Sequence, residues 1–187
     1  MIKLGYKLMA EEHGPSALVR NAQRAEQAGF DFAAISDHYC PWLEEQGHSP
    51  FAWSVLGALA NATRRIGLMT SVTCPIMRYH PAIIAQAAAT MGVLSGNRFT
   101  LGLGAGERLN EHVVGAGWPG RGERHERLSE AADIIQACWW AISRTTGENT
   151  SGWIMPACST GPMASLPWRL PPVAPKRRAS PVERGTA

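Results

Sequence analysis

The sequence lacks the features that mark several large classes of protein. Its four cysteines lie 34, 64 and 20 positions apart, with no CxxC pair and no histidine pair at zinc-ligand spacing, which argues against a zinc site and a disulfide framework. No apolar run approaches the ~20 residues that span a bilayer. The N-terminus has no apolar signal-peptide segment followed by a cleavage site. We therefore expect no metal, no membrane association and a cytoplasmic location.

Positive charge is also scarce where a nucleic-acid-binding face would need it. Residues 1–143 hold 12 Lys and Arg against 13 Asp and Glu, whereas residues 144–187 hold 6 against 2. The formal charge of +3 therefore comes from the C-terminal stretch. Since binding to phosphates needs clustered Lys and Arg, this distribution excludes a basic face on the N-terminal part. We expect a small-molecule substrate, with a homodimer as a possible assembly and no nucleic-acid partner.

Four short apolar runs alternate with longer segments whose apolar residues recur at helical spacing. The runs are residues 2–9, 30–36, 66–72 and 99–103. The helices are expected from Pro15 to Gly29, after Pro50, from Pro81 to Ser95 and around residues 128–135, because proline favours the first turn of a helix and glycine follows its end. This is the sequence pattern of parallel βα units.

The repeat of about 35 residues is close to the ~31 expected for a (β/α)8 barrel. A doubly wound sheet is the rival architecture, but it normally carries a glycine-rich phosphate loop after its first strand, and residues 9–14 contain none. The sequence predicts an α/β fold, a partial TIM barrel of about four βα units over residues 1–143. Residues 144–187 hold seven of the thirteen prolines and no apolar periodicity, so we expect an irregular tail, disordered or translated out of frame.

Polar residues follow the apolar runs, at the strand ends where a barrel places its chemistry. Glu11 follows the first run, Asp37 and His38 the second, and Glu107 the fourth. Histidine can accept and release a proton near neutral pH. The alternatives are a helix-capping Asp37 beside a surface His38, and a Glu107 that only stabilises a helix N-terminus. Trp42 could equally stack on a flat ring or cover the barrel mouth.

Four segments in order resemble one family of enzymes. They are SDHYCPW (36–42), QGHSPFAWSVLGALA (46–60), TSVTCPIMRYHPAIIAQAAATM (70–91) and LGLGAGERLNEHVVG (101–115). They are similar to the F420-dependent glucose-6-phosphate dehydrogenase type, within the luciferase-like barrel superfamily. The resemblance covers residues 1 to about 140 and implies an oxidoreductase that moves hydride from a hydroxyl substrate, such as a sugar phosphate or another alcohol, to coenzyme F420.

The resemblance also implies roles for individual residues. His38 would exchange a proton with the substrate hydroxyl, Glu107 would be the acid/base partner on the other side, and Trp42 would support the ring. Glu11 sits where the family keeps another active-site carboxylate. The residues implied to hold the cofactor are Asp37, Ser71, Val72, Thr73, Cys74, Ala105, Gly106 and Asn110, with a cis peptide between Ser71 and Val72.

The sequence departs from the family pattern in two ways. Cys74 and Ala105 stand where the glucose-6-phosphate enzyme has threonines, and Thr73 could supply one of the missing hydroxyls. The second half of the barrel has no counterpart, so we expect an activity impaired by truncation. Two alternatives remain: an FMN-dependent luciferase-like monooxygenase, and a non-catalytic truncated fragment.

Overall fold

A parallel sheet forms the centre of the molecule. The computed structural model describes residues 2–146 and 154–156, with side chains up to Trp139. The strands are hydrogen-bonded in chain order, each parallel to the next. They are β1 (Gly5–Leu8), β2 (Phe32–Ile35), β3 (Gly67–Thr70), β4 (Phe99–Leu103) and β5 (Ile154–Pro156).

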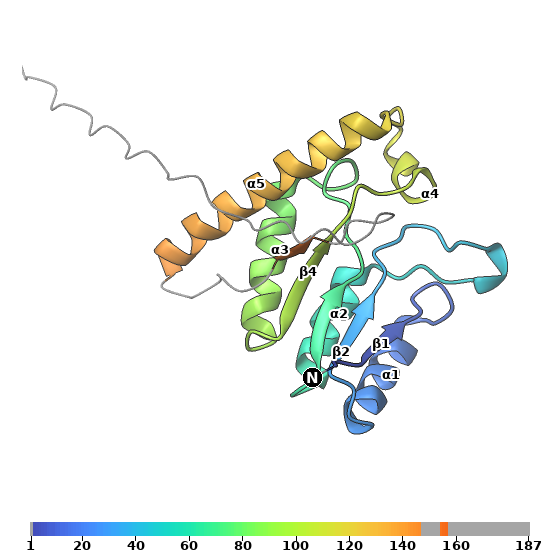
Figure 1. Cartoon of the computed structure of the whole chain (residues 1–187). Coiled ribbons are helices and arrows are strands. Elements are labelled where there is room, and N and C mark those ends of the chain that lie inside the picture. Colours follow the sequence, from blue (N-terminus) through green and yellow to red (C-terminus); the bar gives the residue numbers. More distant parts are fainter. Residues whose placement is uncertain (1, 147–153, 157–187) are drawn as a thin grey trace, which may run out of the picture.

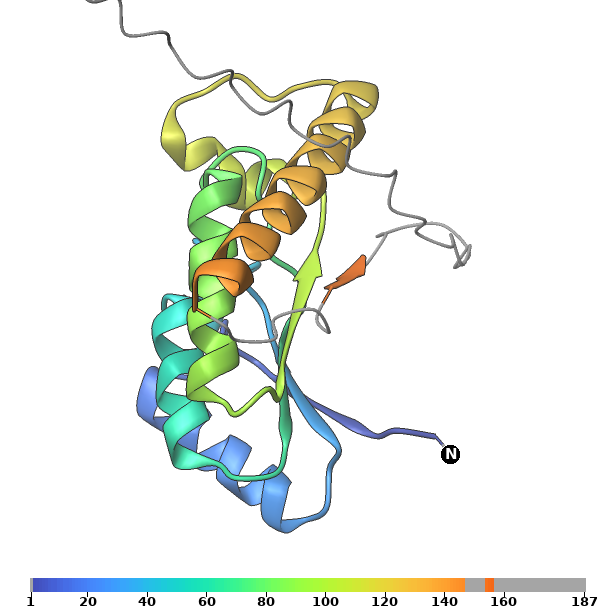
Figure 2. The same cartoon turned by 90° about the vertical axis from the view of Figure 1, so that its left-hand side faces the viewer.

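The helices connect successive strands and lie together on one side of the sheet (Figures 1 and 2). The α-helices are α1 (Pro15–Gln27), α2 (Ala52–Ala62), α3 (Pro81–Leu94), α4 (Arg108–Glu111) and α5 (Arg121–Thr146), and the 3-10 turns are η1 (Glu44–Gln46) and η2 (His112–Val114). A doubly wound sheet would have helices on both faces and a reversal in strand order. Sequential strands with helices on one face form an arc of a barrel, so the predicted partial TIM barrel is confirmed.

The predicted helix boundaries have local causes. Pro15 and Pro81 occupy the first turns of α1 and α3, where a missing N–H costs nothing. The ring of His80 caps α3 by accepting a hydrogen bond from the Ala82 amide at 3.2 Å. Gly29 follows α1 with a φ of 89°, a conformation that favours glycine.

A single hydrophobic core fills the space between the sheet and the helices. Its fully buried side chains include Leu8, Ile35, Leu68 and Leu101 from the strands and Leu18, Leu56, Ile84 and Ile135 from the helices. The indole N–H of Trp139 donates to the carbonyl of Ala85 at 2.7 Å and joins α5 to α3. In the described part of the chain, no helix is long and apolar enough to cross a membrane.

The structure has regular elements at two places within residues 144–187, the range that was predicted to be irregular. α5 continues to Thr146, and β5 adds three residues parallel to β4. Backbone pairing to an existing strand edge can form a strand without apolar periodicity, which explains why the sequence pattern did not predict β5. The rest of the predicted tail lies outside the described residues.

Candidate active site

The carboxyl ends of β1, β2 and β4 bring three predicted residues together. His38 Nδ1 lies 2.6 Å from Glu11 Oε1, and His38 Nε2 lies 3.8 Å from Glu107 Oε1. The ring of Trp42 packs edge-on against that of His38, with centroids 5.1 Å apart. The imidazole therefore has one nitrogen facing a buried carboxylate and the other facing a half-exposed one, which suits it for moving a proton.

Glu11 is the buried member of this group. Only 2% of the residue is exposed, and burial alone would raise the pKa of its carboxyl. The His38 ring, whose Nδ1 lies 2.6 Å from the carboxylate, opposes the effect of burial and lowers the pKa to about 2. Glu11 is therefore an ionised carboxylate at neutral pH, and it holds the proton of His38 on Nδ1.

Lys7 connects β1 to the ends of β2 and β3. Its Nζ donates to Ser36 Oγ at 2.6 Å and lies 3.5 Å from the Ser71 carbonyl oxygen. Desolvation lowers the pKa of Lys7, and the charge of Glu11 opposes that shift. Lys7 and Ser36 give no signal in the sequence, because both lie inside apolar runs that indicate only strands.

Asp37 is buried, and its carboxylate is fully used within the protein. Its Oδ2 accepts from Trp53 Nε1 at 3.2 Å and from Thr73 Oγ1 at 2.8 Å, while Oδ1 accepts from the Tyr79 hydroxyl at 2.9 Å. Burial raises the pKa of Tyr79 and Asp37 adds to that shift, so the phenol keeps its proton and donates. The side chains of Asp37 and Thr73, both predicted to bind cofactor, thus face each other.

Arg78 joins three loops in a buried ion network. Its Nε lies 3.0 Å from Glu111 Oε1, its backbone amide donates to Glu111 Oε2 at 3.2 Å, and its Nη2 donates to the Asp37 carbonyl at 2.5 Å. The side chains of Arg78, Glu111 and Asp37 are 8%, 2% and 1% exposed. Arg78 thus holds the loop after β3 against the end of β2 and against α4.

Asn110 ties the loop after β2 to the loop after β4. Its Oδ1 accepts from the amides of Tyr39 and Cys40 at 2.6 and 2.7 Å, and its Nδ2 donates to Glu107 Oε1 at 2.5 Å. The residue is 1% exposed. Because both ends of its amide are engaged, Asn110 positions the backbone beside His38 and the carboxylate of Glu107.

The glycines after β4 allow close packing against the end of β3. A Cβ on Gly104 would lie 2.4 Å from Val72 Cγ2, and one on Gly106 would lie 2.5 Å from Cys74 Sγ. The atoms that require glycine at these two positions therefore belong to the protein. The Ser71–Val72 peptide is cis, as the resemblance implied. Burial, with the charge of Glu111, raises the pKa of the Cys74 thiol to about 12.

The predicted site residues divide into two groups by exposure. The buried ones are Glu11, Asp37, Thr73, Cys74 and Asn110. Those with surface open to a ligand are His38, Trp42, Ser71, Val72, Ala105, Gly106 and Glu107. A sequence pattern places both groups at strand ends, but only the tertiary structure separates side chains that can touch a ligand from those that support them.

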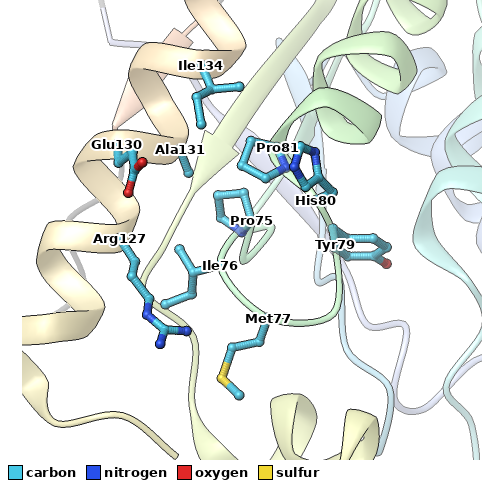
Figure 3. A pocket seen from close by; sticks show the side chains of 10 residues that line it. All are labelled: Pro75, Ile76, Met77, Tyr79, His80, Pro81, Arg127, Glu130, Ala131 and Ile134. Carbon is cyan, nitrogen blue, oxygen red and sulfur yellow. The ribbon is translucent and has the colours of Figure 1, made fainter. Parts of the chain in front are cut away.

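A hollow of about 330 Å³ lies beside this rim, between the loop after β3 and α5. Figure 3 shows Ile76 and Met77 from the loop and Arg127 from α5 projecting into the gap. Tyr79 also lines the hollow, and its hydroxyl donates to Asp37. The loop after β3 therefore borders both the hollow and the buried network.

Comparison with known proteins identifies the family. The model of the luciferase-like monooxygenase family matches residues 2–174. The chain belongs to that family. It is 48% identical over 150 residues to the F420-dependent glucose-6-phosphate dehydrogenase of Beutenbergia cavernae and 50% identical over 139 residues to that of Kribbella flavida. These matches cover 80% and 74% of this chain but 44% and 42% of the relatives.

Two solved structures show the same arrangement. An F420-dependent secondary alcohol dehydrogenase, in complex with an F420–acetone adduct, superposes with a TM-score of 0.72 at 37% identity, over 73% of this chain and 42% of that one. The F420-dependent tetrahydromethanopterin reductase of Methanopyrus kandleri gives a TM-score of 0.59 at 26% identity, over 72% of this chain and 39% of that one. The chain thus spans less than half the length of these relatives.

Proposed function

We propose that the protein is an F420-dependent oxidoreductase that takes hydride from a carbon bearing a hydroxyl group. The observation that carries the proposal is the position of His38, held between Glu11 and Glu107 at the carboxyl ends of the strands. Support comes from relatives that are 48% and 50% identical and named for F420-dependent oxidation of glucose 6-phosphate. The same similarity favours F420 over FMN.

The open surface of the rim fits a flat redox ring. The half-buried backbone at Ser71, Val72, Ala105 and Gly106 lies on one part of the rim, and Trp42, which is 54% exposed, lies with His38 on another. Aromatic faces and backbone amides are the groups that hold flat heterocycles in proteins. We assign these residues to cofactor contact and the buried Asp37, Thr73, Cys74 and Asn110 to their support.

The reaction needs one proton acceptor on the protein. When bound, the deazaflavin supplies the hydride acceptor. His38 Nε2, the nitrogen that faces Glu107, takes the proton of the substrate hydroxyl. The hydrogen on the same carbon leaves as hydride, and the carbon–oxygen bond becomes a carbonyl. Glu11 at Nδ1 stabilises the resulting imidazolium, because it is buried and ionised. Trp42 packs against the ring and limits its rotation.

We assign Glu107 the role of acid/base partner on the other side of the hydride transfer. Its carboxylate receives a hydrogen bond from Asn110, which fixes the oxygen that faces His38. Because His38 accepts a hydroxyl proton in this proposal, the substrate is a hydroxyl compound. A sugar phosphate and a secondary alcohol both belong to this class. Arg78 is committed to Glu111 and Asp37, so within the described residues it cannot serve as a phosphate-binding cation.

Coenzyme binding and turnover test the proposal together. The chain is titrated with oxidised F420 and with FMN, and then glucose 6-phosphate or 2-propanol is added while the absorbance of oxidised F420 is followed. We expect F420 to bind more tightly than FMN. A His38→Gln variant should lose at least ~100-fold in hydride transfer, a larger factor than it loses in coenzyme affinity. Tighter binding of FMN, with oxygen consumption when reduced FMN is supplied in place of F420, would support the monooxygenase alternative.

A further inference from the structure

We propose that Ser49 is a positioning residue that, together with the backbone amide of His48, holds His38 against Glu11. The Ser49 hydroxyl donates to the His38 carbonyl at 2.9 Å, and the His48 amide donates to the Glu11 carbonyl at 3.1 Å. Two neighbouring residues of one loop thus bind the two residues whose side chains meet at 2.6 Å. The resemblance assigns no role to Ser49. The inference rests on the proposed function and deepens it, because it concerns how the proton acceptor is held.

The sheet itself does not fix the spacing of this pair. The last partners in the β1–β2 ladder are Leu8 and Ile35, which are 27 positions apart, and Glu11 and His38 have the same separation three residues further along. Beyond Leu8 the chain enters a turn, so the ladder ends before it reaches them. Successive Cα atoms are ~3.8 Å apart, so donors from residues 48 and 49 hold the two carbonyls close together. These two hydrogen bonds take the place of the missing ladder.

The peptide bond that follows His38 is held at both of its ends. Its carbonyl accepts from Ser49 Oγ, and its amide, that of Tyr39, donates to Asn110 Oδ1 at 2.6 Å. A peptide unit is planar, so one hydrogen bond still lets the plane swing, whereas one at each end fixes its orientation. The imidazole extends from the Cα that begins this plane. The orientation of the peptide therefore decides where Nδ1 lies relative to Glu11.

Ser49 presents its hydroxyl from a restrained backbone. Pro50 follows it, and the residue before a proline is biased to extended conformations. Trp53, in the first turn of α2, is buried and donates its indole N–H to Asp37 Oδ2 at 3.2 Å, which anchors the loop beside His38. The N-cap of α2 is Phe51, and the helix has no side-chain cap hydrogen bond. Ser49 is therefore not a helix cap, and its hydroxyl serves the His38 carbonyl.

The tautomer of His38 tests the inference without any coenzyme. The chain has six histidines, and the ring ¹⁵N signals that disappear in His38→Gln identify those of His38. Because Nδ1 faces Glu11, the neutral ring should carry its proton on Nδ1. Ser49→Ala should lower the Nδ1-protonated fraction by about half, and Ser49→Thr, which keeps the hydroxyl, should restore it. The matched control is Ser54→Ala, which removes an exposed serine hydroxyl from α2 and should leave the fraction unchanged. An unchanged fraction in Ser49→Ala would overturn the inference.

A second variant covers the case in which Ser49→Ala does not fold. Ser49→Cys is close to serine in size and replaces the hydroxyl by a weak donor, so it should shift the tautomer in the same direction. In both variants kcat for F420 reduction should fall about 10-fold, with F420 affinity and substrate KM within about two-fold of wild type. An equal loss of rate and coenzyme affinity would indicate general disorder of the rim and overturn the positioning role. If the unaltered chain does not reduce F420, the proposed function fails, while the tautomer measurement still decides this inference.

Discussion

Arg78 is the residue whose removal should damage the candidate site most. It is the cation between two buried carboxylates, with Glu111 at 3.0 Å and the Asp37 carboxylate at 3.6 Å. Replacement of Arg78 by methionine keeps much of the side-chain volume and removes the positive charge. The buried carboxylates of Glu111 and Asp37 would then have lost the counter-ion that Arg78 provides. Breaking a buried ion pair in this way costs about 3–5 kcal/mol of unfolding free energy.

The loss should depend on pH through Glu111. Burial already raises the pKa of Glu111 in spite of Arg78, and removing the guanidinium raises it further. A carboxyl whose pKa is raised by folding takes up a proton when the chain folds. The free-energy cost of burying the charged carboxylate is absent below the pKa of the unfolded chain, near 4.5. It is complete above the raised pKa of the folded protein. The destabilisation by Arg78→Met should therefore be smaller near pH 5 than near pH 8.

Urea unfolding followed by circular dichroism measures this at both pH values. Arg127→Met is the matched control, because Arg127 pairs with Glu123 on the surface of α5, where the two side chains are 45% and 52% exposed. A surface pair of this kind contributes about 0.2–1 kcal/mol. If Arg78→Met were as mild as Arg127→Met, or lost more stability at pH 5 than at pH 8, the account of the buried network would be wrong.

Three further changes test the packing of the rim. Asn110→Ala removes the acceptor of two part-buried amides and the donor to Glu107, and should cost ~2 kcal/mol in urea unfolding. Hydrogen exchange at the amides of Tyr39 and Cys40 should become faster, and unchanged exchange would contradict the positioning role of Asn110. Gly106→Ala should destabilise more than Gly115→Ala, because both have positive φ but only the first would place a Cβ against Cys74, and equal unfolding free energies would refute this reason. Iodoacetamide should label Cys40 at least ~100-fold faster than Cys74, whose thiol is buried with its pKa raised to about 12; equal rates by mass spectrometry would contradict that burial.

The repeating part of the fold could be predicted because its causes are local. Proline at the first turn, glycine after the last, and apolar residues at fixed spacing determine the strand and helix order. The sequence placed the α3 helix from Pro81 to Ser95, and the structure begins it at Pro81 and ends it at Leu94. β5 differs, because three residues paired to a neighbouring strand leave no periodic pattern.

The site could be predicted only as a set of residues at strand ends. Their division into buried and open side chains depends on partners far away in sequence, such as Arg78 with Asp37, 41 positions apart, and Asn110 with Tyr39, 71 positions apart. Glu111 gave no sequence signal, because an acidic residue within a short helix resembles any solvated position. Its partner on the loop after β3 makes it part of the site.

The measurement that tests the central claim most directly is a map of the F420 contact surface on the protein. Backbone amide resonances and histidine ring resonances are recorded with and without the oxidised coenzyme. The account predicts shifts at Ser71, Val72, Ala105 and Gly106 and at the ring of His38, which together form the open part of the rim. Shifts confined to residues 127–134 on α5, or no shifts at saturating F420, would contradict it.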